Sequence, residues 1–363
     1  MSDMETTKIN TILFTLVLFI FNGKVVFSDE NHDSEKHPLT SSVSCPQESD
    51  AEGRRYLTAD MMPSEMMFNE LRHNLPGLKN LNNKQIMMMM KLMGPNYYWT
   101  FDKKNPDQKT GAMILAHGFG EEGDLEFHNS MTDISSKHIT TLSLGMSMMT
   151  SKHIECALFE LRQSGAEKIY IVPIITTPHN TLAQQWEYIF GLRNDHAYAK
   201  VKSLKPEDVV FLKPINDHQI AKQIVLDYTK EISINPKNEV VVIIGHGPVR
   251  EIDNQHELQI MENLAVYVRE NGKFSVVKPF TLQDDSPKEI RDKNVNQIKQ
   301  FMETATLGGK KVLMVSNLMS GKGIQRKITK DFSGLDYEFN SKGFLTHPLF
   351  KEWILQSIES SDR

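Results

Sequence analysis

The sequence has few of the features that would assign it to a specialised class of protein. Its two cysteines, Cys45 and Cys156, are too few for a cysteine-rich zinc site or a framework of several disulfides. They could form a single bridge, but nothing in the sequence favours one. No extended basic run occurs and the formal net charge is −5, so a surface that coats nucleic acid is not expected. Apolar residues make up 39% and charged residues 24%, as in ordinary globular proteins.

One hydrophobic run stands out, and it lies near the N-terminus. Residues 11–21 (TILFTLVLFIF) are too few to span a bilayer comfortably, but they match the core of a signal peptide in length. Ser28 offers a small residue at a cleavage position. We therefore expect residues 1–28 to be a signal peptide or, alternatively, an uncleaved anchor. The protein is then expected to be exported to a periplasm or secreted, with no stable membrane span after processing.

Residues 29–108 are predicted to form a disordered leader followed by a methionine-rich helical extension. Ser64 is a plausible start for one helix, and Asn82 or Asn83 could cap a second that stops near Gly94. Nine of residues 61–93 are methionine. Thioethers can bind Cu(I), but we favour the interpretation that the methionines form a flexible apolar helix face covering the main domain.

From residue 109 onward, short apolar runs alternate with amphipathic stretches. Strands are expected at residues 112–117, 168–175, 240–246 and 310–319, with helices at 149–165 and 256–272. Strands that alternate with helices of this length predict parallel βαβ units. The sequence therefore predicts an α/β fold of two doubly wound lobes, at residues 109–235 and 236–363.

The two predicted lobes resemble each other in sequence. AMILAHGFGEEGD (residues 112–124) aligns with VVIIGHGPVREID (residues 241–253). Each segment has an apolar run, then His-Gly, then Glu five residues and Asp seven residues after the histidine. The matched residues are His117 and His246, Glu122 and Glu251, and Asp124 and Asp253. This pattern predicts an internal duplication.

His117 and His179 each follow a predicted strand, and ligands of α/β sheets bind beyond the carboxyl ends of the strands. Two neutral imidazoles facing one cleft would suit a divalent first-row metal. Glu122 and Asp124 could attract the cation or relay protons, or they could lie in a solvated loop. His246 is a possible accessory residue, although a structural role is the better interpretation because the second half has no counterpart of His179.

The segments LAHGFGEEGD and IVPIITTPH resemble the sirohydrochlorin chelatases of the CbiX/SirB type, which are class II chelatases. The resemblance covers residues 111–357 and includes THPLFKEWI as a closing helix. It implies two similar flavodoxin-like lobes around a tetrapyrrole cleft, with Co2+, Fe2+ or Ni2+ as the inserted substrate and no organic cofactor. In this family the residues that match His117 and His179 bind the metal and help to remove pyrrole protons.

Two other functions compete with a chelatase. One is an exported carrier of metal or tetrapyrrole that has this fold without turnover. The other is a serine hydrolase, whose best nucleophile candidate is Ser147 in a motif that lacks its closing glycine. The aromatic residues Trp186, Tyr188 and Phe190 could stack on a macrocycle, but core packing is favoured. Three further histidines have no supporting pattern and are expected at the surface: His128, His153 and His256.

Overall fold

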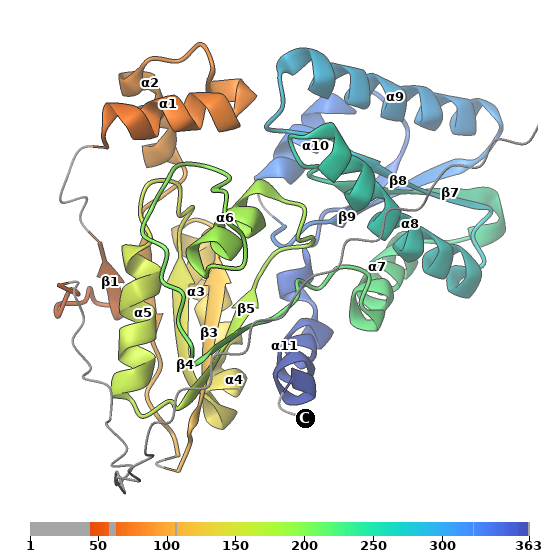
Figure 1. Cartoon of the computed structure of the whole chain (residues 1–363). Coiled ribbons are helices and arrows are strands. Elements are labelled where there is room, and N and C mark those ends of the chain that lie inside the picture. Colours follow the sequence, from red (N-terminus) through yellow and green to blue (C-terminus); the bar gives the residue numbers. More distant parts are fainter. Residues whose placement is uncertain (1–43, 58–62, 106, 322, 362–363) are drawn as a thin grey trace, which may run out of the picture. The chain divides into compact units, whose positions relative to one another are not determined.

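The computed structural model describes residues 44–57, 63–105, 107–321 and 323–361, and it contains two β-sheets flanked by helices (Figure 1). The predicted signal peptide at residues 1–28 lies outside the described residues. So do the predicted leader up to residue 43 and the methionines Met61 and Met62.

The first sheet has six strands. In order across the sheet they are β1 (Arg54–Tyr56), β2 (Tyr97–Thr100), β4 (Ile139–Leu144), β3 (Thr110–Ala116), β5 (Lys168–Pro173) and β6 (Val209–Phe211). Strands β4, β3, β5 and β6 are parallel, whereas β2 pairs antiparallel with β4 and β1 with β2. Strands β1 and β2 come from the predicted extension, so this segment is not only helical.

The second sheet has four strands, all parallel. Their order is β10 (Glu338–Asn340), β9 (Lys311–Asn317), β7 (Glu239–Gly245) and β8 (Val276–Thr281). In the reverse direction the order is β8, β7, β9, β10, which matches β4, β3, β5, β6 of the first sheet position by position. Strand β7 therefore corresponds to β3, and β9 to β5. The predicted α/β architecture is confirmed, with a second sheet that is wholly parallel and a first sheet that is parallel except for β1 and β2. The internal duplication stays a prediction.

Helices connect the strands as the βαβ pattern predicts. They are α3 (Glu121–Ser130), α4 (Thr132–Lys137), α5 (Lys152–Gln163), α6 (Thr181–Ile189), α7 (Gln219–Ile232), α8 (Glu251–Gly272), α9 (Lys288–Leu307), α10 (Ile324–Asp331) and α11 (Pro348–Ser361), with short 3-10 turns at Pro76–Leu78, Pro236–Asn238 and Phe344–Thr346. Helix α5 buries Ile154, Leu158 and Leu161, whose spacing places them on one face. We call the first sheet with α3–α6 the first lobe, and the second sheet with α7–α10 the second lobe.

One hydrophobic core runs through both lobes. It contains Ile114 of β3, Ile243 of β7 and Val315 of β9, together with Trp353 of α11. Helix α7 precedes residue 235 but packs against α8 and β9, and α11 contacts both α7 and α4. Burial of the large side chain of Trp353 stabilises this junction by roughly 3–5 kcal/mol relative to alanine.

The methionine-rich extension forms two helices that pack on the first lobe, α1 (Glu65–Asn74) and α2 (Asn83–Leu92) (Figure 1). Ser64 caps α1, and Asn82 caps α2 in a capping box with Gln85, as the sequence suggested. Phe68, Leu71, Leu78 and Ile86 are buried in the core of the first lobe. The extension is therefore an integral part of this lobe.

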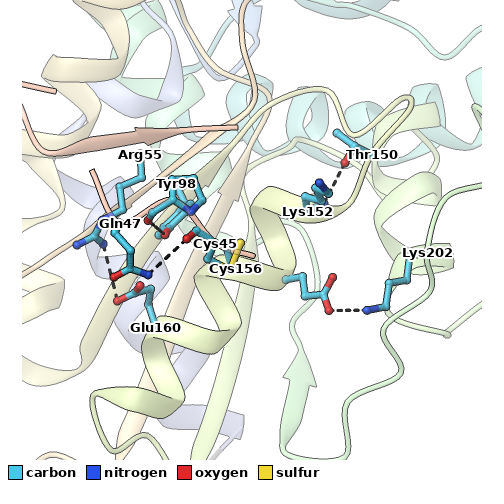
Figure 2. The surroundings of a disulfide bond; sticks show 11 residues. Cys45, Gln47, Arg55, Tyr98, Thr150, Lys152, Cys156, Glu160 and Lys202 are labelled. Atoms are coloured by element: carbon cyan, nitrogen blue, oxygen red, sulfur yellow. Dashed lines mark hydrogen bonds and ion pairs between the residues drawn. A yellow bond between two sulfur atoms is a disulfide. The ribbon is translucent and has the colours of Figure 1, made fainter. Parts of the chain in front are cut away.

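A disulfide joins Cys45 to Cys156 of α5, with 111 residues of sequence separation and 5.6 Å between the Cα atoms (Figure 2). The sequence alone allowed this bridge but did not predict it. The segment after Cys45 is also held by hydrogen bonds, because the Tyr98 hydroxyl donates to the carbonyl of Pro46 (3.1 Å) and the Trp99 indole donates to that of Glu52 (2.7 Å). Cross-link and hydrogen bonds together fasten the start of the described chain to the first lobe.

Candidate metal centre

His117 is the first residue after β3, in a turn that glycine makes possible. Gly118 has φ of 92°, in the left-handed region where a side chain would be strained. The His117 ring packs edge-on against Phe119, with ring centroids 4.9 Å apart. The turn thus fixes a half-buried imidazole at the carboxyl end of the central strand of the first sheet.

His246 occupies the corresponding position after β7. Gly247 has φ of 79°, and a Cβ at this position would lie 2.8 Å from both the Gln283 backbone nitrogen and Thr281 Cβ, so only glycine fits. His246 Nδ1 lies 3.1 Å from the Gly247 carbonyl oxygen and donates a proton to it. This hydrogen bond leaves Nε2, which is 3.5 Å from Asp285 Oδ2, as the nitrogen available to a ligand.

The two histidines reach one cavity from opposite lobes. A cavity of about 320 Å3 is lined by His117, Tyr198 and Met146 from the first lobe and by His246 and Asp285 from the second. A second cavity of about 320 Å3 shares His246, Asp285 and Tyr198, and its wall includes Met89 and Met93 of the extension. Each volume is near the lower end of the range of small-molecule sites.

The two cavity histidines differ in electrostatics. Burial lowers the pKa of His117, and the neighbouring His246 adds to this effect against opposing contributions from the Gly118 backbone and Asp285. Burial also acts to lower the pKa of His246, but Asp285, the Gly247 backbone and nearby acids outweigh burial and raise it. At neutral pH, His117 is therefore a neutral imidazole that can ligate a metal or accept a proton.

Asp284 lies beside His246 and Asp285, and the three groups together could hold a metal ion. Asp284 is, however, already paired with two cations. Its Oδ1 accepts from Arg291 (2.8 Å) and its Oδ2 from Lys327 (2.5 Å), and these contacts hold its pKa low although burial acts to raise it. Asp284 therefore orders the loop, while the exposed Asp285 is the carboxylate that lines the cavity beside His246.

His179 lies in a different environment from the one expected. Its Nδ1 is 3.9 Å from Asp253 Oδ1, and its ring centroid is 4.7 Å from that of His256. Both partners belong to α8 of the second lobe. Burial lowers the pKa of His179, and His256 adds to this effect while Asp253 opposes it. The titratable groups that act on His117 are His246 and Asp285. The structure therefore groups His117 with His246, and it groups His179 with residues of α8.

The predicted accessory acids are on α3. Asp124 is buried, where its Oδ2 accepts from the Tyr97 hydroxyl (2.6 Å) and its Oδ1 from the Phe119 backbone (2.5 Å). This carboxylate therefore braces the turn after His117. Glu122 is exposed on the first turn of the same helix.

Several other sequence expectations have a clear outcome. Trp186, Tyr188 and Phe190 are buried in the core of the first lobe, as favoured. The expectation that His153 is a surface residue is wrong, since it is fully buried on α5 with Nε2 3.2 Å from Ser147 Oγ.

His128 is not a simple surface residue either, because its ring stacks between Trp99 and Phe101. His256 is exposed, as expected.

The contact between Ser147 and His153 bears on the hydrolase alternative. Ser147 Oγ accepts from the Trp186 indole, and Ser147 is completely buried. Burial lowers the pKa of His153 to about 3, which makes it a poor base, and its Nδ1 has no hydrogen-bond partner among the described residues. A catalytic serine needs an exposed oxygen and an oriented base, so this pair is structural.

Sequence reasoning missed Asp285, Asp253 and His256 as partners of the histidines. Asp253 carried a signal, since it matches Asp124 in the aligned segments. Asp285 and His256 carried none, because their relation to the histidines arises only from the packing of strands and helices distant in sequence.

Comparison with solved structures identifies the architecture. SirB from Bacillus subtilis with Fe3+ matches with a TM-score of 0.51 and 18% identity, over 69% of this chain and 95% of that one. The chain has the fold of SirB. This agrees with the class II chelatase motifs quoted above, and at this identity the likeness concerns the fold.

DR2241 from Deinococcus radiodurans, described as similar to chelatases with two additional novel domains, gives a TM-score of 0.40 and 14% identity. It is matched over 69% of this chain and 54% of its own length. No protein-family model matches the sequence, and no curated protein matches it either. Within the described ranges, no helix is both long and apolar enough to cross a bilayer.

Proposed function

We propose that this protein is a chelatase that inserts a divalent metal, Co2+, Fe2+ or Ni2+, into sirohydrochlorin or a related tetrapyrrole. The observation that carries the proposal is the meeting of His117 and His246, each at the end of a central parallel strand, in one cavity between the lobes. The SirB-like fold supports a chelatase in general terms. The metal ion is a substrate in this reaction.

The chemistry requires a metal ligand and acceptors for two pyrrole protons. His117, neutral at pH 7 because burial lowers its pKa, can serve in either role. His246 and Asp285 add a second imidazole and a carboxylate from the opposite side of the cavity. His179 was predicted to act with His117. It lines neither cavity, so we assign the direct role at the macrocycle to His117 and His246.

The test is a time course of sirohydrochlorin absorbance with Co2+ or Fe2+. We expect multiple turnovers above the spontaneous rate, reduced by about 100-fold in His117→Ala and by about 10-fold or more in His246→Ala. His73→Ala, which removes an exposed histidine of α1, is the matched control and should retain full activity. Full activity in both cavity variants would contradict the site assignment.

A carrier is the second candidate, and the disulfide is the observation that favours it. We propose that the protein is exported, because disulfides persist mainly in oxidising compartments. Few tetrapyrrole intermediates need a metal there, which favours carriage over insertion. A one-to-one spectral shift without turnover in the same assay would identify a carrier.

A further inference from the structure

Three side chains from two lobes lie close together, and none of them lines the cavity that His117 and His246 share. His179 comes from the loop between β5 and α6, while Asp253 and His256 come from the first turns of α8. One ligand atom of each lies within 4.8 Å of the others. The i, i+3 spacing of Asp253 and His256 sets them on one face of the helix, directed at the loop of the other lobe.

The set consists of two imidazoles and one carboxylate. These ligands suit Zn2+, Fe2+ and Co2+, and three of them leave coordination positions for water. Three atoms that are at most 4.8 Å apart lie within about 2.8 Å of a common point, whereas metal bonds to nitrogen and oxygen are about 2.0–2.2 Å. Side-chain movements of about 0.7 Å would therefore complete the coordination.

The local charge also favours a cation. Asp253 uses Oδ2 to pair with Arg250 (3.1 Å), which orients the carboxylate and leaves Oδ1 toward His179. The N-terminal end of α8 adds a partial positive charge of about half a unit. Asp253 and Glu251, the two acidic residues of the first turn of α8, together carry two negative charges, which exceed the contributions of Arg250 and the helix end. Arg250 is also well exposed and can move away as a metal binds.

We propose that His179, Asp253 and His256 bind a divalent first-row metal ion at a site separate from the cavity of His117 and His246. The ion links the β5–α6 loop of the first lobe to α8 of the second. Asn180, the next residue, lines both cavities and caps α6. Binding at His179 would therefore also fix one wall of the cavity. The site does not depend on the proposed chelatase activity.

The experiment measures metal stoichiometry on the full chain by equilibrium dialysis with Co2+, without any tetrapyrrole. We expect two equivalents for the unmodified protein and one for His256→Gln and Asp253→Asn, each with more than about 100-fold weaker binding at the lost site. Gln255→Ala, an exposed neighbour on the same helix, is the matched control and should keep both. His246→Ala should lose the other equivalent.

Each outcome has a distinct meaning. Unchanged stoichiometry and affinity in both His256→Gln and Asp253→Asn would overturn the inferred site, whatever the chelatase assay gives. Loss of an equivalent in these variants with none lost in His246→Ala would uphold it and count against metal binding in the cavity. The melting temperature supplies a second measurement: Zn2+ should raise it in His246→Ala and not in a His246→Ala/His256→Gln double variant. Equal increases in both would also overturn the site.

Discussion

Removing the disulfide should lower the free energy of unfolding by an amount that follows from its position. The bridge spans 111 residues of sequence. Closing a loop of this length reduces the entropy of the unfolded chain by an amount worth about 5 kcal/mol at 25 °C in the chain-entropy treatment. Hydrogen bonds from Tyr98 and Trp99 still hold the segment after Cys45, so the folded state should change little and most of the effect should lie in the unfolded state.

The assay is urea unfolding of a Cys45→Ala/Cys156→Ala double variant, followed by circular dichroism. With an m-value of about 3–4 kcal/mol/M for a chain of this size, the midpoint should fall by roughly 1.2–1.7 M. A reductant should shift the unmodified protein in the same direction and leave the double variant unchanged. Midpoints that agree within about 0.3 M would refute the reasoning, because the bridge would then constrain neither state measurably.

Two further predictions concern buried polar groups of the first lobe. Burial lowers the pKa of His153 to about 3, below its value of about 6.5 in the unfolded chain, so the folded state resists protonation. The free energy of unfolding should therefore be unaffected by His153 above about pH 6.5 and decline as the pH falls toward 3. At pH 5 the decline should be about 2 kcal/mol. His153→Gln should remove this part of the decline between pH 7 and pH 5 in urea titrations, and an identical decline in both proteins would contradict it. Asp124→Asn and Tyr97→Phe should each lower the free energy of unfolding by about 1–3 kcal/mol. A double-mutant cycle should give an interaction energy of about 1 kcal/mol between the two side chains. Strictly additive losses would argue against the hydrogen bond.

The sequence predicted the strand ends well because each combines two strong local signals. The runs before His117 and His246 are continuously apolar, as in strands buried on both faces, and a glycine with positive φ follows each histidine. These features depend only on neighbours along the chain. The same reasoning found the caps at Ser64 and Asn82.

Partners across the lobes could not be predicted in this way. His179 meets His256, and His117 meets His246, only because the two sheets share a core and orient their strand ends toward each other. Strands β1 and β2 were missed for a related reason. They are three and four residues long, and they are defined by pairing, of β1 with β2 and of β2 with β4, rather than by a local hydrophobic period.

Asp124 and Asp253, each seven residues after a strand-end histidine, have different partners, and strand β2 supplies one of those of Asp124. Asp124 is bonded to Tyr97, a residue of the strand that the extension contributes to the first sheet. Among the described residues the second sheet consists of parallel strands alone, and the buried Asp253 has His179 of the other lobe and Arg250 as its partners. The extension therefore determines the surroundings of a carboxylate inside the first lobe. A chain without the extension would leave Asp124 without the Tyr97 hydroxyl, so that the Phe119 backbone would have to hold this buried carboxylate alone.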